Sequence, residues 1–407
     1  LIISSEIKPI LKFTKKNGSN LNNLALKKYL LKNDYFAGRE TLFDNIYQVL
    51  PGEIGTIINN QIFLKQIYKK INFNTKSKKN NYFKILKNNI LKHLISDKKI
   101  SLSLSSGIDS SLIAHYIYNS KKKYELQSYT YDYDGESYEY NEASKFANSY
   151  NQQTKKIIID HNYIINNFEK FVISNEGPIG GINQFGLFEV CNQAKQDGYD
   201  VVLSGFGLDE SLASYKSIKQ DLKENEYFKL IDNYMVKNAH FVSENYQEKL
   251  QKLIENYFFN IKIPRTTHMV DRSSMHSSVE MRLPFLEKNF VEATVKQIDM
   301  NSKIDKIIIR KFLNKNSNYK KDWLQPKIHV PHPQNKWLRY GIFSEWTDYL
   351  LKDNFIYKNL EFLDKKEIIN SWKKFKNNEI PNGYLFWQII NLYFIKKNFI
   401  KFMEKFK

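Results

Sequence analysis

The sequence predicts an α/β fold built on a doubly wound parallel sheet. Short apolar strands alternate with helices from about residue 81 to residue 203, and clusters of Ser, Gly and Asp directly follow two of these strands. From about residue 222 onward the pattern is mainly helical. In doubly wound sheets ligands bind at the carboxyl ends of the strands, so we expect the chemistry of this chain in the segments that follow them.

Composition narrows the classes of function. The 407 residues allow two or three domains, and a content of 42% hydrophobic and 15% aromatic residues indicates a globular protein. No apolar run approaches the roughly 20 residues of a membrane-spanning helix, so we expect a cytoplasmic protein with no membrane partner. The net charge of +19 comes from scattered lysines without a zinc-finger or RNP motif, and we expect no nucleic-acid partner. With one cysteine, Cys191, neither an internal disulfide nor a cysteine metal cluster can form.

The first 80 residues predict a separate region. Residues 1–68 show short strand-like runs and turns, including a hairpin in which 54–58 and 61–64 flank Asn59-Asn60. Residues 69–80 are polar and rich in lysine, which is typical of a linker. The chain starts at Leu1 rather than at Met, which predicts that it begins inside a longer protein.

Residues 81–407 form the second predicted region, which opens with a helix at about 81–95. The predicted strands are 100–104, 126–131, 156–159 and 199–203. The predicted helices between and after them are 110–118, 140–149, 163–173 and 184–196. This order places the chemistry immediately after Leu104, Tyr131 and Leu203.

The segment after the first of these strands has the features of a phosphate-binding loop. Leu104 ends the strand, and Ser105-Ser106-Gly107 leads into a helix that starts with Asp109, Ser110 and Ser111. Small residues at a helix N-terminus let backbone N–H groups approach an anion closely. A carboxylate repels phosphate, so Asp109 is expected to bind a Mg²⁺ that neutralises phosphate. The alternative is a Ser-rich capped helix start without function.

A second loop of this kind follows the fourth strand. Ser204-Gly205-Phe206-Gly207 leads into a helix start that carries Asp209 and Glu210. The ends of parallel strands lie along one edge, so Asp109 and Asp209 should lie together there. We expect the two carboxylates to bind a Mg²⁺–pyrophosphate unit, and simple helix capping by Asp209 is the alternative.

Both loops, with five further segments, resemble the asparagine synthetase family. Ser105–Ser110 resembles the SGGxDS loop of the PP-loop ATP pyrophosphatases, and Ser204–Glu210 is similar to the SGEGxDE motif of the asparagine synthetases. Segments 271–286, 306–310 and 326–338 resemble the DRxSMxxSxExRxPFLD, KxxLR and RxKxGFxxPxxxWL blocks. Upstream, 5–11 and 50–52 resemble the ASEIKALL strand–helix segment and the PPG turn of the family's N-terminal class II glutaminase domain.

The resemblance implies a divergent member of that family. Residues 81–407 would form an adenine nucleotide alpha hydrolase-like synthetase domain, and residues 1–68 the end of an Ntn-type α+β glutaminase domain. ATP would adenylate a carboxylate, aspartate or a related acid, and ammonia from glutamine would attack it, giving an amide, AMP and pyrophosphate. The implied cofactors are ATP and Mg²⁺, and the implied partners are the acceptor and glutamine or ammonia. A homodimer is an assembly that the resemblance allows.

Carried over residue by residue, the resemblance also implies a site. Asp109 and Asp209 match Mg²⁺ ligands, and Lys306 matches a lysine that contacts phosphate and stabilises developing charge. Glu280 lies in the block that shapes the acceptor side, with a structural ion pair to Arg282 as the alternative. The residues expected to bind ATP or pyrophosphate are Leu104, Ser105, Ser106, Gly107, Asp109, Ser110, Ser111, Tyr129, Ser204, Gly205 and Lys306.

Three departures from the family pattern bear on the substrate. Ser106 stands where the family favours Gly, and Phe206 replaces a Glu that assists proton removal from the attacking nitrogen. The stretch 176–183 lacks an arginine expected for the α-carboxylate of aspartate. These differences favour an acceptor other than free aspartate. The glutaminase nucleophile is not in this chain, because Cys191 lies in a predicted core helix.

Two other functions stay open at this point. One is a ligase that closes an amide within its own substrate, as the β-lactam synthetases do. The other is a non-catalytic nucleotide-binding homologue, suggested by Ser106 and Phe206. Retention of both Asp109 and Asp209 argues against a decayed site.

Overall fold

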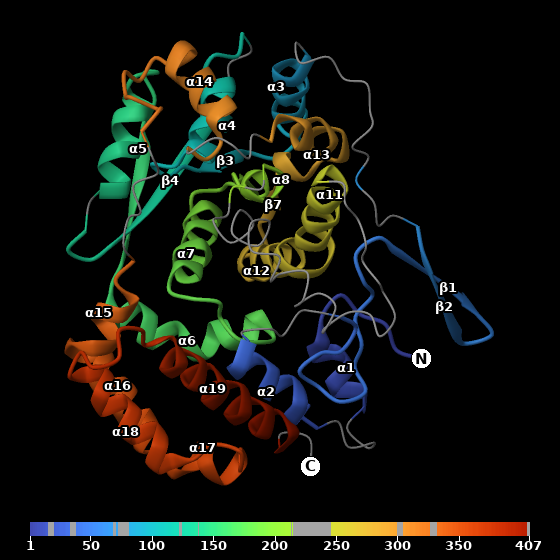
Figure 1. Cartoon of the computed structure of the whole chain (residues 1–407), viewed down its shortest axis with the longest axis vertical. Coiled ribbons are helices and arrows are strands. Elements are labelled where there is room, and N and C mark those ends of the chain that lie inside the picture. The colour runs from blue at the N-terminus through green and yellow to red at the C-terminus, as the bar shows by residue number, and fades with distance from the viewer. Residues whose placement is uncertain are drawn as a thin grey trace.

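A five-stranded parallel sheet lies at the centre of the computed structural model (Figure 1). The structure describes residues 1–14, 20–32, 38–67, 71, 81–121, 124–136, 138–212, 214, 246–298, 304–325 and 332–404. The strands are β3 (Ile100–Ser103), β4 (Leu126–Tyr133), β5 (Thr154–Ile159), β6 (Val201–Leu203) and β7 (Glu280–Arg282). Their order in the sheet is β5-β4-β3-β6-β7. The predicted doubly wound α/β fold is therefore confirmed.

The topological switch point lies between β3 and β6. From β3 the sheet grows in one direction to β4 and β5 and in the other to β6 and β7. Ile100 pairs with both Leu126 and Val201, so the neighbouring strands are in register with β3. Loops at the carboxyl ends of strands on the two sides of a switch point diverge and leave a crevice for a ligand. The two predicted loops follow these two strands.

Helices cover both faces of the sheet. One face carries α3 (Tyr82–Lys92), α4 (Ile108–Tyr118), α5 (Tyr138–Asn148), α13 (Lys288–Thr294) and α14 (Ile307–Asn316). The other carries α6 (His161–Asn175), α7 (Asn183–Gln196) and α12 (Lys262–Met275). Within β6, Val201 and Leu203 join one hydrophobic core and Val202 joins the other, because successive side chains of a strand point to opposite faces.

The C-terminal part is helical, as predicted. It comprises α15 (Gln334–Arg339), α16 (Gly341–Lys352), α17 (Asn354–Asn359), α18 (Lys365–Lys376) and α19 (Tyr384–Glu404). The fully buried Trp372 and Trp387 anchor these helices to the core that contains α6 and α7. Over the described residues, no helix is both long and apolar enough to cross a membrane.

The N-terminal region is more helical than the predicted strand-like runs. Helix α1 (Ile7–Thr14) overlaps the strand–helix segment that the resemblance implied at 5–11, whereas helix α2 (Asn23–Lys32) was not predicted. Ile7, Ile10 and Leu11 recur at helical spacing and pack against the same core as α19. The side chain of Gln388 in α19 donates to the carbonyl of Tyr29 at 2.6 Å. Tertiary burial of a helical stripe therefore decided the local structure.

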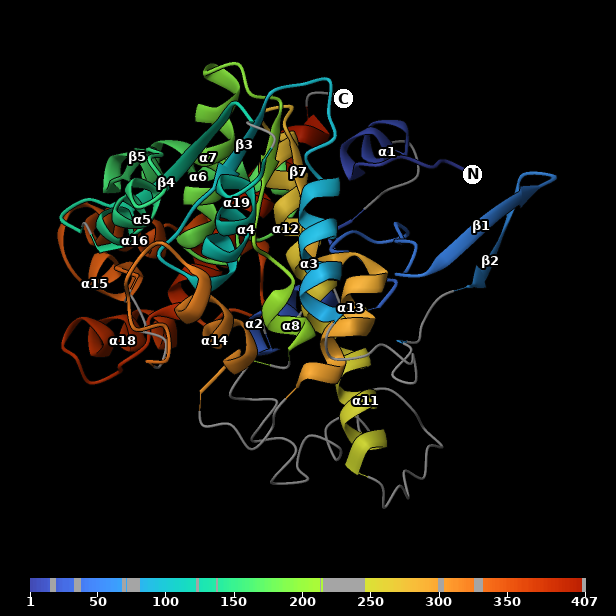
Figure 2. The ribbon, with the colours of Figure 1, turned by 90° about the horizontal axis from the view of Figure 1, so that it is seen from above.

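The predicted hairpin is confirmed. Strands β1 (Glu53–Ile58) and β2 (Gln61–Gln66) are antiparallel, and Asn59 and Asn60 adopt φ of 46° and 60°, which a two-residue type I′ turn requires. Figures 1 and 2 show that the hairpin stands away from the rest of the molecule.

Two predicted segments lie partly outside the described residues, and three elements were not predicted individually. Of the predicted linker 69–80, only Ile71 is described, and its N–H donates to Glu255 at 2.9 Å. Residues 326 and 327 of the third block lie outside the described residues. The edge strand β7 was not predicted, since three residues are too few to show a period. Before α12 the chain forms α11 (Tyr246–Asn256) and a π-helical turn, η3 (Tyr257–Ile261).

Candidate nucleotide-binding site

Lys306 joins the two predicted carboxylates. Its Nζ atom lies 2.6 Å from both carboxylate oxygens of Asp109 and 2.7 Å from Oδ1 of Asp209. The Lys306 side chain is only 4% exposed, whereas both carboxylates are partly open to solvent. Three residues that lie far apart in the sequence therefore meet at the switch point of the sheet.

Electrostatics keep Lys306 charged in this position. Burial by itself would lower the pKa of the Lys306 ammonium, but the carboxylates of Asp109 and Asp209 outweigh it and raise the pKa above its ordinary value. A buried cation of this kind is suited to stabilise negative charge on phosphate oxygens.

The backbone at Lys306 is held in an unusual conformation. Lys306 precedes α14 with φ of 52° and ψ of 33°, a left-handed conformation that is uncommon for residues other than glycine. Arg310, one turn into the helix, is buried and donates to the carbonyls of Asp305, Trp323 and Gln325. Arg310 thus clamps the chain on both sides of α14. Its place in the KxxLR-like block is explained by this structural task.

Two glycines allow the second loop to approach the first. A Cβ atom on Gly205 would stand 2.9 Å from Cβ of Asp109 and 3.0 Å from the nitrogen of Ser110, so only glycine fits. Gly207 has φ of 103°, and a Cβ there would stand 2.5 Å from a methyl group of Leu286. The loop after β6 is thereby pressed onto the N-terminus of α4.

The first loop is organised by its serines. Ser110 Oγ accepts from the N–H of Ser105 at 3.0 Å and lies 2.9 Å from Ser105 Oγ. Ser105 Oγ in turn accepts from the N–H of Gly107 at 3.2 Å. Ser105 is exposed, so this compact turn at the start of α4 faces solvent. Small side chains and N–H groups at a helix start are what an anion-binding loop needs.

The remaining predicted residues of the two loops lie deeper. Leu104 is buried, and its N–H donates to the carbonyl of Tyr129 at 2.9 Å. Ser204 is buried, and its N–H donates to the carbonyl of Arg282 at 3.0 Å. Ser111 is 1% exposed, and its hydroxyl has no hydrogen-bond partner within the described part of the chain. Leu104 and Ser204 thus fix the ends of the strands from which the loops start.

Two predicted residues are not brought to this site. Glu280 is the first residue of β7 and pairs with Val201 at the start of β6, so it lies at the amino end of the sheet. Its side chain is 58% exposed and pairs with Arg282 at 2.9 Å, which is the structural ion pair of the alternative interpretation. Glu280 therefore does not lie beside Asp109 and Asp209, which follow the carboxyl ends of β3 and β6.

Tyr129 is the second predicted residue that is not brought to this site. Its carbonyl is engaged by Leu104 and its hydroxyl donates to Asp197 at 2.8 Å, so neither group is directed to a nucleotide. Cys191 is fully buried, and burial raises the pKa of its thiol to about 12, as expected of a core residue.

The structure also adds residues that the sequence did not point to. Glu139 in α5 accepts from the N–H of Ser106 at 2.8 Å. On α12, the Arg265 guanidinium lies against Gly180, where a Cβ would be 3.2 Å from it. Neither residue belongs to a motif, so no signal in the sequence could have marked them.

The donor set fits a magnesium ion that arrives with a nucleotide. Asp109 and Asp209 place carboxylate oxygens within 2.7 Å of one Nζ atom, so both could reach one cation. Mg²⁺ in such sites is held by one or two carboxylates together with waters and phosphate oxygens. Within the described ranges no group of three or more His, Cys, Asp or Glu could hold a metal by itself.

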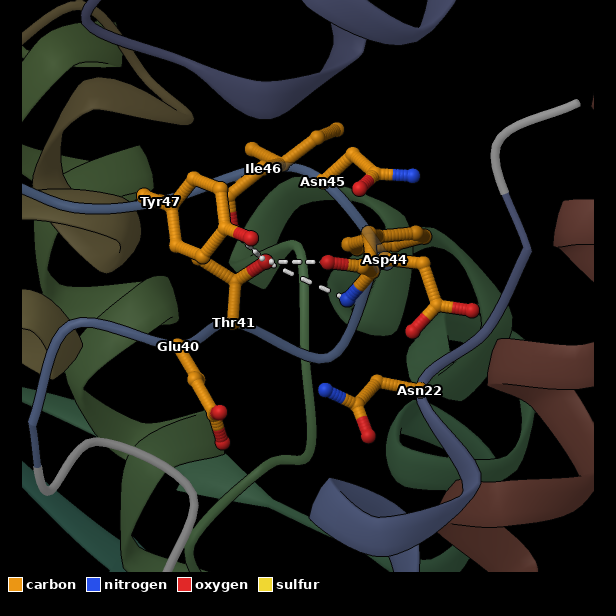
Figure 3. A pocket seen from close by; sticks show the side chains of 8 residues that line it. Asn22, Glu40, Thr41, Asp44, Asn45, Ile46 and Tyr47 are labelled. Atoms are coloured by element: carbon orange, nitrogen blue, oxygen red, sulfur yellow. Dashed lines mark hydrogen bonds between the residues drawn. The ribbon is translucent and has the colours of Figure 1, made fainter. Parts of the chain in front are cut away.

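A cavity of about 260 Å³ lies elsewhere, in the N-terminal region (Figure 3). It is lined by Asn22, Glu40, Thr41, Phe43, Asp44, Asn45, Ile46 and Tyr47. Thr41 shapes its wall by donating to the carbonyl of Ile46 at 2.8 Å. None of the predicted site residues lines it, and we assign it no part in the chemistry.

Comparisons with known proteins show which proteins this chain resembles. Two curated relatives are each 24% identical to the chain. "Putative asparagine synthetase (glutamine-hydrolyzing) 1" of Methanocaldococcus jannaschii matches over 58% of this chain and 39% of its own length. "Asparagine synthetase (glutamine-hydrolyzing) 3" of Bacillus subtilis matches over 69% of this chain and 52% of its own length. The chain thus spans about half or less of the length of these relatives.

Similar solved structures include a thiolase and a synthetase. A U34-tRNA thiolase NcsA from Methanococcus maripaludis shares 15% identity at a TM-score of 0.31, covering 73% of this chain and 79% of that one. An NMN synthetase from Francisella tularensis shares 13% identity at a TM-score of 0.26, covering 51% and 98%. These likenesses are distant. The asparagine synthase family profile matches residues 83–395, which includes the whole sheet, both loops and Lys306, and the chain belongs to this family.

Proposed function

We propose that this chain catalyses ATP-dependent amide formation through an acyl-adenylate. The observation that carries the proposal is Lys306, buried between Asp109 and Asp209 at the switch point of the sheet. A buried cation and two carboxylates, beside a serine-rich loop at a helix start, match the needs of a Mg²⁺–triphosphate group. Membership of the asparagine synthase family supports this reaction class.

The first step would take place at the α-phosphorus of ATP. A carboxylate oxygen of the acceptor attacks it, the bond to the bridging oxygen of pyrophosphate breaks, and acceptor and AMP are joined. The loop Ser105–Ser111 would hold the leaving pyrophosphate, and the Lys306 ammonium would stabilise its developing charge. Mg²⁺, when bound, would be held by Asp109 and Asp209 and would neutralise phosphate oxygens.

The second step forms the amide. An amine nitrogen adds to the acyl carbon, the acyl–oxygen bond to AMP breaks, and a proton leaves the nitrogen. Phe206, half-buried in the second loop, cannot take this proton, since a phenyl ring has no basic atom. The proton would leave through water or the departing phosphate group.

The acceptor would carry a second anionic group. Arg265 lies against Gly180, and Lys262 lies one turn earlier on the same helix. Burial, and then the charge of Arg265, lower the pKa of Lys262, while Glu210 opposes this shift. Glu210 directly follows Asp209, and α8 (Leu208–Ser211) packs against η3. Lys262 and Arg265 therefore connect the acidic segment at Asp209 and Glu210 with residues 176–183, the stretch that lacks the expected arginine.

Ammonia would come from glutamine in a longer protein. The curated relatives are named as glutamine-hydrolyzing, and each is about twice as long as the part matched here, or longer. The exposed apolar surface of the β1–β2 hairpin is evidence for a further segment that packs against it. Ile54, Ile58 and Phe63 on one face and Ile57 on the other are at least half exposed, and a two-stranded ribbon is not stable by itself. Free ammonium should serve this chain as the nitrogen source.

The test is pyrophosphate release from Mg-ATP with ammonium across a panel of carboxylates. We expect release with an acceptor that carries a second anionic group, and loss of at least 100-fold in Asp109→Ala. Lys87→Ala, an exposed change on α3, is the control and should keep the wild-type rate. ATP binding without release for any acceptor would favour a non-catalytic nucleotide-binding role. A folded chain that does not bind ATP would overturn the proposal.

A further inference from the structure

The N–H groups of the first loop already have acceptors within the protein. Ser105 N–H donates to Ser110 Oγ at 3.0 Å, and Gly107 N–H donates to Ser105 Oγ at 3.2 Å. Both acceptors are neutral hydroxyls of the loop itself, which can rotate and donate to a phosphate oxygen instead. Ser106 N–H is different, because its acceptor is the carboxylate of Glu139, at 2.8 Å.

Glu139 reaches the loop from another element. It lies in the first turn of α5, 33 residues beyond Ser106, and it is half-buried. The helix start is fixed independently, since the buried Asp132 accepts from the N–H of Tyr140 at 3.0 Å. Rotation of the Glu139 side chain can therefore break the contact with Ser106 while α5 stays in place.

The Glu139 carboxylate has the chemistry of the group that the loop would bind. A carboxylate oxygen and a phosphate oxygen are both anionic acceptors, and each forms a short, charge-assisted bond with a backbone N–H. One N–H cannot serve both with good geometry, and two anions at that distance repel each other. Pyrophosphate and Glu139 must then compete for Ser106 N–H.

We propose that Glu139 is an internal competitor of pyrophosphate at this loop. It leaves Ser106 when the triphosphate of ATP enters, and it returns to Ser106 as pyrophosphate departs. Glu139 thereby weakens binding of ATP and of pyrophosphate and accelerates release of the product. This inference rests on the proposed function, because it takes the loop to be the pyrophosphate site.

Binding measurements with the full chain test the inference without needing an acceptor. We would measure the dissociation constants of Mg-ATP and of Mg-pyrophosphate by calorimetry for wild type, Glu139→Gln and Glu139→Ala. Both variants should bind both ligands about 3- to 30-fold more tightly, because a charged competitor for one hydrogen bond is gone. The matched control is Glu136→Gln, which removes the same charge from the preceding turn, where Glu136 N–H donates to Tyr133.

Thermal unfolding of each variant shows whether the fold is retained. With a working acceptor, the Glu139 variants should also show a lower inhibition constant for pyrophosphate. Unchanged or weaker binding of both ligands in folded Glu139 variants would overturn the inference and leave the proposed function standing. Equal tightening in Glu136→Gln would overturn it too, since the effect would then come from overall charge. Failure of wild type to bind either ligand would overturn the proposed function together with this inference.

Discussion

Gly205 and Asp109 lie in direct contact although they are 96 positions apart in the sequence, and a Cβ on Gly205 would stand 2.9 Å from Cβ of Asp109. The contact joins the loop after β6 to the loop after β3. It fixes the distance between Asp109 and Asp209 and so the place where Lys306 can bridge them.

We therefore expect Gly205→Ala to impair the site. The new methyl group would have to push back the backbone of Asp109 or Ser110, because neither can rotate away. The change should cost about 1–3 kcal/mol of unfolding free energy and weaken ATP binding at least tenfold. Denaturant unfolding and calorimetry check the two effects. Wild-type affinity in this variant would show that the two loops are not held by close packing.

The second prediction concerns Lys306 and pH. The two carboxylates raise the pKa of Lys306 above its ordinary value of 10.5, so the ammonium stays charged from pH 6 to about pH 10. Its contribution to stability is fully present below the unfolded pKa and is lost only as pH rises through the higher folded pKa. The rate of pyrophosphate release should thus show no loss due to Lys306 between pH 7 and about 10.

Substitutions of Lys306 distinguish its effect on the rate from the effects of other titratable groups. Lys306→Met should lower the rate at least 100-fold, since two partly buried carboxylates would then repel phosphate without a cation. Lys306→Arg keeps the charge and should retain more activity at every pH. A loss of rate near pH 8 in wild type that is absent in Lys306→Arg would contradict the raised pKa.

The third prediction tests the acceptor side. Arg265→Gln should raise KM for an acceptor with two anionic groups about 10- to 100-fold, with little change in ATP affinity, because a guanidinium fork binds such a group at two points. Arg265→Lys should show a smaller rise. Lys87→Gln on α3 is the control. Equal KM values in wild type and Arg265→Gln, for acceptors with and without the second anion, would exclude this role.

The fourth prediction concerns the N-terminal segment. Glu176 is almost fully buried and accepts from the N–H of Lys8 at 2.9 Å, while its other oxygen lies 3.0 Å from the guanidinium of Arg272. Arg272 also donates to the carbonyl of Ser5 at 2.9 Å. Glu176→Gln leaves Arg272 without its buried counter-charge and should cost about 2–4 kcal/mol of unfolding free energy.

Limited proteolysis should then cleave this variant near residue 8 faster than wild type. The comparison is Glu169→Gln, which breaks the more exposed ion pairs with Lys397 and Lys401 and should cost less than 1 kcal/mol. If the two variants are equally stable and equally resistant to protease, the buried pair does not anchor the N-terminal segment.

Much of the fold and part of the site could be predicted from the sequence. Buried parallel strands form short apolar runs, and β3, β4, β5 and β6 appear within about two residues of their predicted positions. The edge strand β7 is only three residues long, and α2 packs against α19, so neither followed from local pattern. Glu280 was misplaced because a motif gives an order along the chain but does not say which end of a strand a residue occupies.

The sequence by itself determined the doubly wound sheet and the two small-residue loops with Asp109 and Asp209 after its strands. These features are local, since periodicity and turn chemistry act over a few residues. Only the tertiary structure decided that Lys306 bridges both carboxylates and that Glu139 reaches Ser106. It also decided that Glu280 lies at the amino end of the strands, whereas both carboxylates follow their carboxyl ends. Such contacts join segments that are distant in the chain, and their geometry is set by how the helices pack on the sheet.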